Sequence, residues 1–246
     1  GIMTKRIVAI SQPMYFPWPG FMEMMALADT FIWLDDAQFS KGSFTNRIQV
    51  CSDVGTNWMT IPLENKGRFT PIRDMKASGD DWAASHRSLL ANSLRGYKHS
   101  SAALDIFDKT CNTNENLCHL LIASSEELAK YIGVAPKRTV RSSELAVEGA
   151  SWRRVLDLVK AVGGDTYVSG AGGASYLDHD AFNIEGVSVE YMSYSLNTWD
   201  QRRAESTPFV SSLDLIAAEG TRASEFLYPK SVGWQEFLAQ RSETDE

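Results

Sequence analysis

The sequence predicts an α/β fold built on a parallel, Rossmann-like sheet with a helical insertion. Short β-branched apolar runs alternate with helical segments at both ends of the 246-residue chain, and this alternation is typical of parallel sheets. The middle of the chain, roughly residues 40–133, has hairpin and helical character instead. We therefore expect a single α/β domain over residues 3–240, followed by a disordered tail at 241–246.

The first third of the chain has the pattern of a β–loop–α–β unit. IVAIS (7–11) and TFIWLDD (30–36) are apolar, β-branched runs, and we predict a strand for each. Between them lie a loop rich in proline and aromatic residues (12–20) and a predicted short helix, FMEMMALAD (21–29). Such units build parallel sheets.

The predicted insertion begins with a hairpin and continues as helices. RIQVCSD (47–53) and NWMTIPLE (57–64) are strand-like and are separated by a short turn. Residues 80–97 begin with acids, as a helix N-terminus should, and residues 114–133 have the clearest helical pattern in the chain. Gly133 stands where a helix C-cap glycine belongs.

The last third returns to the alternating pattern. KRTVRSSEL (137–145), TYVSG (166–170) and GVSVEYMSY (186–194) predict three more strands, and residues 151–164 predict a helix that Ser151 caps. Two short helices are expected after them. Five strands with intervening helices indicate a doubly wound sheet.

Composition narrows the class of protein. The net charge of −7 shows no large basic footprint, so we expect no nucleic-acid partner. No apolar run approaches the roughly 18 residues that a membrane span needs, and no signal peptide is visible. The three cysteines, an odd number without CxxC spacing, suit a reducing compartment. We expect a cytoplasmic protein.

The loop after the first predicted strand is one candidate binding site. Ligands of open α/β sheets bind beyond the carboxyl ends of the strands, and helix N-termini attract anions. Aromatic rings in this loop could stack on a base or a sugar, whereas the alternative is a proline-rich turn packed on the core. We predict substrate binding by Gln12, Tyr15, Phe16 and Gly20.

Two acids end the second predicted strand and mark another candidate site. We expect Asp36 to bind a metal, a ribose hydroxyl or a substrate amine, and Arg47 to grip a carboxylate or phosphate. Asp35, Gln38 and Asn46 are predicted to contact substrate. In the alternative, the acids and Arg47 form a structural ion pair, and the sequence favours neither.

A glycine-rich turn after the strand at 166–170 is the remaining candidate. Its backbone N–H groups could cradle an anion, although a flexible turn is the alternative. The substrate-binding residues predicted here and further along the chain are Ser169, Gly170, Gly172, Gly173, Tyr176 and Gln201. Arg202 and Arg203 read as a solvated turn.

Proton transfer has one candidate outside these loops. His86 lies on a predicted helix and could act as an acid or base, so the predicted catalytic set is Asp36, Arg47 and His86. No HExxH motif or other pair at metal-ligand spacing appears, and the GxSxG motif of α/β-hydrolases is absent. We predict no metal-ligand set.

The stretch from Ala9 to Val50 resembles the N-terminal signature of the WbqC-like family. WMTIPLE, YVSGAGGASYLD and the later Gln201 with Pro208-Phe209 are similar to further blocks of the family, so the likeness spans nearly the whole chain. Phe44 departs from it, because tryptophan is expected there. The signature residues are Gln12, Pro13, Tyr15, Phe16, Pro17, Gly20, Asp29, Asp35, Asp36, Gln38, Asn46 and Arg47. The resemblance implies surface-polysaccharide (O-antigen) or specialised-metabolite biosynthesis and indicates where the site lies, but no catalytic residues.

A fainter resemblance concerns the fold. The opening strand, proline loop, glycine and helix are similar to the start of HIGH-superfamily nucleotidylyltransferases, whose His-x-Gly-His turn holds a triphosphate. Phe16–Phe21 has the glycine but neither histidine, which puts that phosphate chemistry in doubt.

The leading hypothesis is a transferase or ligase that modifies a small amine or a sugar-nucleotide. The cofactor is unidentified, with a nucleotide and Mg²⁺ as one candidate, and the substrate is either free or bound to a carrier protein. The alternatives are a non-catalytic metabolite-binding protein and a scaffold for other biosynthetic enzymes.

Overall fold

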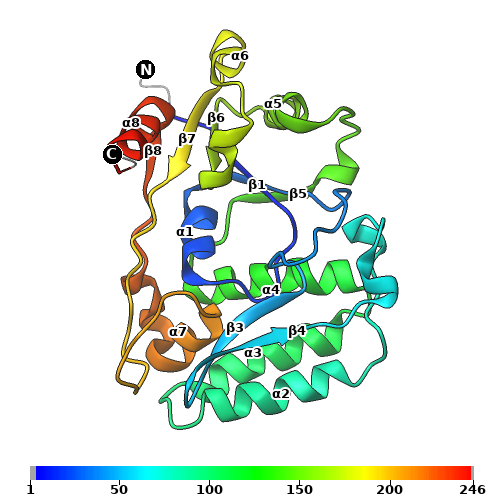
Figure 1. Ribbon diagram of the computed structural model, residues 1–246, viewed down its shortest axis with the longest axis vertical. Helices are drawn as coiled ribbons and strands as arrows, with labels where there is room; N and C mark the ends of the chain where they lie inside the picture. Colours follow the sequence, from blue (N-terminus) through cyan, green and yellow to red (C-terminus); the bar gives the residue numbers. More distant parts are fainter. Residues whose placement is uncertain (1–3, 245–246) are drawn as a thin grey trace.

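The fold is taken from a computed structural model that describes residues 4–244. It contains a six-stranded sheet of order β5-β2-β1-β6-β7-β8, seen in the upper part of Figure 1, and a separate two-stranded hairpin. Five strands of the sheet are parallel, and β8 pairs antiparallel with β7. The strands are β1 (Ile7–Ser11), β2 (Thr30–Trp33), β5 (Arg138–Arg141), β6 (Thr166–Ser169), β7 (Ser188–Met192) and β8 (Ser231–Gly233).

The predicted α/β class with a mostly parallel sheet is confirmed. Each of the five predicted strands is present. The inner strands β2, β1, β6 and β7 lie between two layers of helices, whereas the edge strand β5 has only exposed and half-buried residues. The strand β8 was not predicted, since three residues carry no periodic signal. The second strand is shorter than expected, so Asp35 and Asp36 follow β2 in a turn.

The strand order places a topological switch point at the centre of the sheet. From β1 the chain builds outward through β2 and β5, then crosses back to β6 on the other side of β1. The register pairs Ala9 with Val168, so the loops that follow β1 and β6 leave the sheet side by side. This edge is where ligands of doubly wound sheets bind.

Alternate residues of the strands enter two different cores. Ala9, Phe31 and Val168 face the core formed with α1 (Pro19–Leu27) and α4 (Leu117–Ile132). Their neighbours Val8, Ile32 and Tyr167 face the opposite core. That second core is formed with α5 (Ser151–Ala161), α6 (His179–Ile184) and α8 (Trp234–Thr244).

The insertion between β2 and β5 forms the lower part of the molecule in Figure 1. The hairpin lies over the helices, and α7 from the C-terminal part packs beside them. Its elements are β3 (Arg47–Ser52), β4 (Gly55–Thr60), α2 (Trp82–Ser93), α3 (Ser100–Thr113) and α4, while α7 spans Ser212–Glu219. Gly133 ends α4 with a φ of 91°, as its sequence position predicts.

The end of the chain differs from the expected tail. Residues up to Thr244 belong to α8, whose Trp234 and Phe237 pack on the second core, and this packing is what orders the segment. Residues 245 and 246 of the predicted tail lie outside the described residues. At α5 the predicted cap also shifts, because Ser151 is inside the helix and Ala150 is its N-cap.

Two further findings bear on the class of protein. Among residues 4–244, no helix is long and apolar enough to cross a membrane. Cys51, Cys111 and Cys118 are all free thiols.

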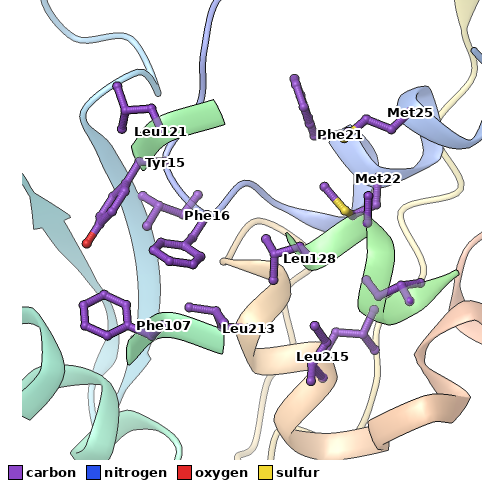
Figure 2. Packing of buried hydrophobic residues seen from close by; sticks show 14 of the residues in the cluster. Tyr15, Phe16, Phe21, Met22, Met25, Phe107, Leu121, Leu128, Leu213 and Leu215 are labelled. Carbon is purple, nitrogen blue, oxygen red and sulfur yellow. The ribbon is translucent and has the colours of Figure 1, made fainter. Parts of the chain in front are cut away.

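The loop after β1 joins the sheet to the helical insertion. Tyr15 and Phe16 are fully buried, and Figure 2 shows both rings among side chains of the helices. Ser124 of α4 holds this loop, because its hydroxyl accepts the Phe16 N–H at 3.0 Å and lies 2.9 Å from the Met14 carbonyl. The loop therefore has a structural role in joining the two parts.

The start of α1 depends on a glycine. Trp18 lies directly over Gly20, and a Cβ at Gly20 would overlap the indole ring. We predict that Gly20→Ala lowers the free energy of unfolding by about 1–3 kcal/mol, because overpacking forces this ring to move. Urea unfolding measures the change. Gly172→Ala is the matched control, since a Cβ there meets no atom within 4 Å, and equal losses in the two variants would refute the steric account.

Candidate functional site

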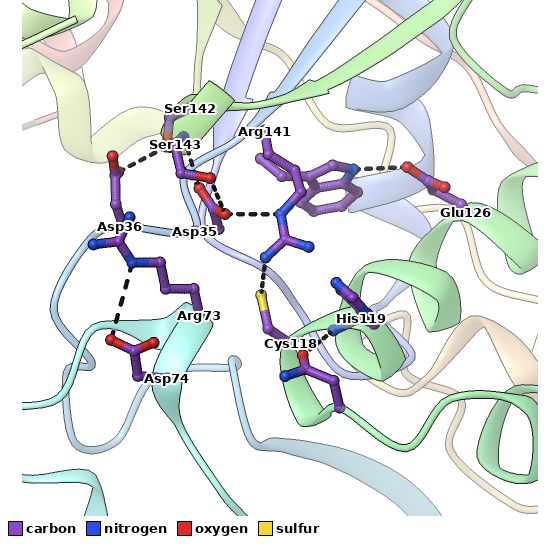
Figure 3. A network of polar contacts seen from close by, with 12 residues as sticks. Asp35, Asp36, Arg73, Asp74, Cys118, His119, Glu126, Arg141, Ser142 and Ser143 are labelled. Atoms are coloured by element: carbon purple, nitrogen blue, oxygen red, sulfur yellow. Dashed lines mark hydrogen bonds and ion pairs between the residues drawn. The ribbon is translucent and has the colours of Figure 1, made fainter. Parts of the chain in front are cut away.

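The carboxyl edge of the sheet gathers three of the predicted loops. Gln12 follows β1, Asp35 and Asp36 follow β2, and the glycine-rich turn follows β6. Asp35 is fully buried there. Figure 3 shows it between Arg141 at the end of β5 and the next two serines. The Arg141 Nε donates at 2.7 Å, the Ser143 N–H at 2.9 Å and the Ser143 hydroxyl at 2.6 Å.

The environment of Asp35 favours its ionised form. Burial alone would raise the pKa of this carboxyl, but the hydrogen bonds from Ser143 and Arg141 and the charge of Arg141 lower it below its ordinary value. Both carboxylate oxygens are occupied by donors from the same chain. Asp35 therefore ties β2 to β5 as a structural anion.

Asp36 has an arginine partner of its own. Arg154 of α5 donates to its two oxygens at 3.0 and 2.7 Å, and the Ser142 hydroxyl donates at 2.7 Å. Burial raises the pKa of Asp36, but these hydrogen bonds outweigh it and hold the pKa below its usual value. The sequence left open whether Asp36 binds a ligand or forms a structural ion pair, and these contacts agree with the ion pair. Its arginine is Arg154 and not Arg47.

Arg47 lies apart from both acids. Its guanidinium carbon is 3.9 Å from the ring centroid of Trp58, and its Nη2 donates to the Gly42 carbonyl at 2.7 Å. The neighbouring predicted residues are also engaged. Asn46 is buried and donates to the Ile61 carbonyl at 2.9 Å, and Gln38 forms a β-bridge with Pro71.

Tyr15 and His86 are joined in the core. The Nε2 of His86 is 2.9 Å from the Thr60 carbonyl, which can only accept, so Nε2 carries the proton. The Nδ1 atom therefore accepts from the Tyr15 hydroxyl at 2.7 Å. Burial lowers the pKa of His86 and keeps the ring neutral. In this conformation neither ring is open to a ligand, and the proton-transfer role of His86 stays a prediction.

The glycine-rich turn and the start of α1 leave little room for an anion. Residues Ala171–Ser175 form a 3-10 helix, and Gly170, Gly172 and Gly173 lack the positive φ angles that a nest of N–H groups uses. Gly172 and the half-exposed Tyr176 face open space. At α1, Trp18 covers Gly20, and the Ser212 N–H donates to the Pro17 carbonyl.

A large cavity lies elsewhere, between the end of the β3–β4 hairpin, the end of α2 and the loop after Trp199. Its volume is about 950 Å³. We call it the arginine cavity, because three arginines line it with one aspartate, Asp53. The lining residues are Cys51, Ser52, Asp53, Asn57, Leu89, Asn92, Ser93, Arg95, Gly96, Tyr97, Gln201, Arg202, Arg203 and Ala204. This local excess of positive charge lies in a chain of net charge −7.

Gln201 is the one predicted site residue that lines the arginine cavity. Its amide is used within the chain, because Nε2 donates to the Thr207 carbonyl at 2.6 Å and Oε1 accepts the Thr207 N–H at 3.0 Å. Gln201 thus shapes the loop that presents Arg202 and Arg203. Arg202 lies directly over Gly96, and Arg203 donates to the Gly55 carbonyl.

One wall of the arginine cavity rests on a buried carboxyl group. Asp214 of α7 is 2% exposed, and its Oδ1 accepts from the Tyr97 hydroxyl at 2.9 Å and from the Trp199 indole at 2.8 Å. Burial raises the pKa of Asp214, while the two hydrogen bonds lower it less strongly. Asp214 therefore links the end of α2 to the loop that carries the arginines.

The thiol at this wall is protonated. Burial and the nearby Asp214 carboxylate raise the pKa of Cys51 to about 12, and the same two causes raise the pKa of Tyr97. Because the thiolate is the nucleophilic form, Cys51 is a poor nucleophile here. Within residues 4–244, no group of three or more His, Cys, Asp or Glu side chains could hold a metal ion.

Comparison with known proteins covers most of the chain. The profile of the WbqC-like protein family matches residues 12–226. The chain belongs to the WbqC-like protein family. A relative from Mycobacterium tuberculosis (strain ATCC 25618 / H37Rv), the uncharacterized protein Rv1507c, is 29% identical over 226 residues, 89% of this chain and 96% of the relative. No solved structure matches the chain. All residues of the arginine cavity, and Asp214 behind it, fall within the range matched to the WbqC-like family.

Sequence reasoning missed most of the arginine cavity. The sequence predicts a solvated turn at Arg202 and Arg203 and places Tyr97 at the end of a helix. One signal was present, since two consecutive arginines directly follow Gln201 in an acidic chain. Nothing in the spacing indicates that this loop meets β3 and α2.

The buried ion pair of Asp35 makes a testable contribution to stability. We predict that Asp35→Asn lowers the free energy of unfolding at neutral pH by about 3–5 kcal/mol, because Arg141 loses its anion. The folded pKa is lowered, so this stabilisation is present above the unfolded pKa and is lost as pH falls through the folded pKa.

Urea unfolding at neutral and acid pH measures this effect. The two proteins should converge at acid pH. Asp74→Asn is the control, because Asp74 is 62% exposed and lies 3.9 Å from Arg73. An equally small effect of both substitutions would contradict the structural role of Asp35.

Asp214 should impose the opposite pH dependence. Its folded pKa is raised, so its contribution to stability is full below the unfolded pKa and is lost as pH rises through the folded pKa. Asn at this position can still accept both hydrogen bonds but carries no charge. We therefore predict that the wild type loses stability relative to Asp214→Asn as pH rises from acid to neutral, above the pKa of an unfolded aspartate. Thermal melts across this range measure the difference, and parallel profiles would refute it.

Proposed function

We propose that this family member is a transferase or ligase that modifies a small amine or a sugar-nucleotide in glycan or specialised-metabolite biosynthesis. The arginine cavity carries the proposal. Its volume of about 950 Å³ suits a small-molecule substrate, and its three guanidinium groups suit phosphate or carboxylate. Bound to an anionic donor, these arginines would stabilise the negative charge that develops on it during transfer.

The polar wall of the cavity favours direct attack by the acceptor. A covalent intermediate on Cys51 is disfavoured, because its pKa is raised to about 12. An attacking amine or hydroxyl must lose a proton, and Asp214 is a carboxyl group that reaches the cavity through the Tyr97 hydroxyl. Tyr97 lines the cavity and donates to Asp214, so it can pass this proton inward as it accepts one from the acceptor.

The topology supports a Rossmann-like origin of the sheet. If the six strands of the sheet are numbered along the chain, their order across the sheet is 3-2-1-4-5-6, with the last strand antiparallel. This is the order of doubly wound dinucleotide-binding sheets. A relation to HIGH-superfamily nucleotidylyltransferases rests on the sequence of the first loop, which lacks both histidines of that turn. A nucleotide with Mg²⁺ therefore stays one candidate cofactor among several.

A non-catalytic metabolite-binding protein is the second candidate. The observation that favours it is the state of the cavity's reactive groups, since the thiol is protonated and Gln201 is fully engaged. A scaffold is less favoured, because a scaffold needs no cavity of this size.

A ligand screen followed by a turnover assay separates these functions. Thermal shifts with nucleotides, sugar-nucleotides, acyl-CoA thioesters and amino acids, with and without Mg²⁺, identify what binds. Mass spectrometry of each binding compound mixed with candidate amine acceptors then detects product. The transferase or ligase proposal requires product, whereas a shift without product in any mixture supports the binding protein.

The same assay tests the arginines. We predict that Arg203→Gln lowers kcat/KM by about 10–100-fold, because a hydrogen bond to a charged group is lost. Arg202→Gln, on an exposed side chain, should act in the same direction without affecting the fold. Arg222→Gln is the control, since Arg222 is 71% exposed and pairs with Glu225. Wild-type turnover in both cavity variants would exclude this cavity as the active site.

A further inference from the structure

Two buried side-chain atoms without a hydrogen-bond partner belong to residues of the arginine cavity, and others, such as Thr45 Oγ1 and Thr110 Oγ1, lie away from it. Ser93 Oγ and Arg203 Nη1 are buried atoms for which residues 4–244 offer no hydrogen-bond partner. Both residues line the cavity, one from α2 and the other from the facing loop. Unsatisfied buried polar groups are rare in folded proteins, and an unbound ligand is one of their causes. An arginine N–H can only donate and a serine hydroxyl can also donate, so a ligand with several acceptor oxygens can satisfy both residues.

The charge of the lining specifies what kind of acceptor. Arg202, exposed over Gly96, adds a second guanidinium next to Arg203 in sequence, and Arg95, two residues after the end of α2, adds a third. Guanidinium groups and a hydroxyl together match an oxyanion with several acceptor oxygens, as a phosphate ester has. A carboxylate offers two oxygens and leaves more of these donors unmet.

A carboxylate and an amide that line the cavity indicate the rest of the ligand. Asp53 and Asn57, from the end of the hairpin, are exposed and line the same space. A carboxylate accepts hydrogen bonds, and an amide both donates and accepts them. The pair therefore suits hydroxyl groups, which donate and accept.

A nucleobase finds no surface to stack on here. Tyr97 is the sole aromatic residue among those that line the cavity in the described chain. It is 9% exposed, and its hydroxyl is committed to Asp214. Protein sites that hold bases commonly use an open aromatic face.

From these observations we infer that the arginine cavity recognises a phosphate ester on a hydroxylated carbon skeleton, the chemistry of a sugar phosphate. Arg203, Arg202 and Ser93 bind the phosphate, and Asp53 and Asn57 bind the hydroxyl groups. This inference rests on the proposed function, for which it names the part of the substrate that enters the cavity. In a sugar-nucleotide, the sugar and its phosphate enter and the base stays outside.

Isothermal titration calorimetry on the full chain tests the inference with defined probes. The probes are a panel of hexose 1-phosphates, the same free hexoses, inorganic phosphate, UMP and UDP-hexoses. At least one hexose 1-phosphate should bind about tenfold or more tightly than its hexose, than phosphate and than UMP. A free sugar phosphate and a sugar-nucleotide are distinguished by which of the two matched compounds binds more tightly.

Variants assign the two halves of the ligand. Arg203→Gln and Arg202→Gln should each weaken the hexose phosphate about 10–100-fold, and Asn57→Ala should weaken the hexose phosphate but not inorganic phosphate. Arg222→Gln should bind as the wild type does. Tighter binding of UMP than of every hexose 1-phosphate, no binding of any panel member beyond phosphate, or no effect of Asn57→Ala would each overturn the inference.

These outcomes are separate from the fate of the proposed function. Binding of a hexose phosphate without product in the turnover assay would leave the inference intact and reject the transferase or ligase. Turnover with an unphosphorylated substrate, unaffected by Arg203→Gln, would reject the inference alone.

Discussion

The hydrogen bonds that Ser124 makes to the loop after β1 join the two parts of the molecule. One hydroxyl satisfies the Phe16 N–H and bonds the Met14 carbonyl, so the chain leaves the sheet and enters the helical layer at a fixed point. Phe16 has a φ of 40°, which is costly for a residue with a side chain and persists only where its surroundings hold it. Here that strain orients two aromatic rings into the helical core. The position of the insertion under the sheet depends on this junction.

From the junction, a chain of buried polar contacts leads to the arginine cavity. Tyr15 bonds His86 of α2, and His86 bonds the Thr60 carbonyl of β4, so the helix and the hairpin are held together at one end. At their other ends, Asp214 ties Tyr97 to the loop before the arginines. The arginine cavity lies where α2, the β3–β4 hairpin and the loop after Trp199 separate. Its walls are therefore set by contacts in the core, and the arginines need not hold the fold together.

The sequence predicted the sheet well because the sheet depends on local pattern. Each parallel strand is a short β-branched run, and in the inner strands both faces are buried, so the signal lies within the run itself. The helix end at Gly133 was equally predictable, because a helix that ends in the left-handed conformation strongly favours glycine there. Residues such as Ser231–Gly233 carried no such signal, because an edge strand of three residues depends on its neighbour. The order of the strands follows from crossovers that no local pattern encodes.

The candidate site was less predictable, because its chemistry depends on partners far apart in sequence. Asp36 at a strand end looks the same whether it meets a substrate or Arg154, which lies 118 positions further along the chain. The rule that ligands bind at the carboxyl edge holds when that edge is open. In this protein Arg141 of β5 and Arg154 of α5 pair with the acids there, and Trp18 covers the helix start. The insertion and the C-terminal loop form a cavity of their own, and the accessible positive charge lies there. The candidate site is therefore at this cavity and not at the carboxyl edge of the sheet.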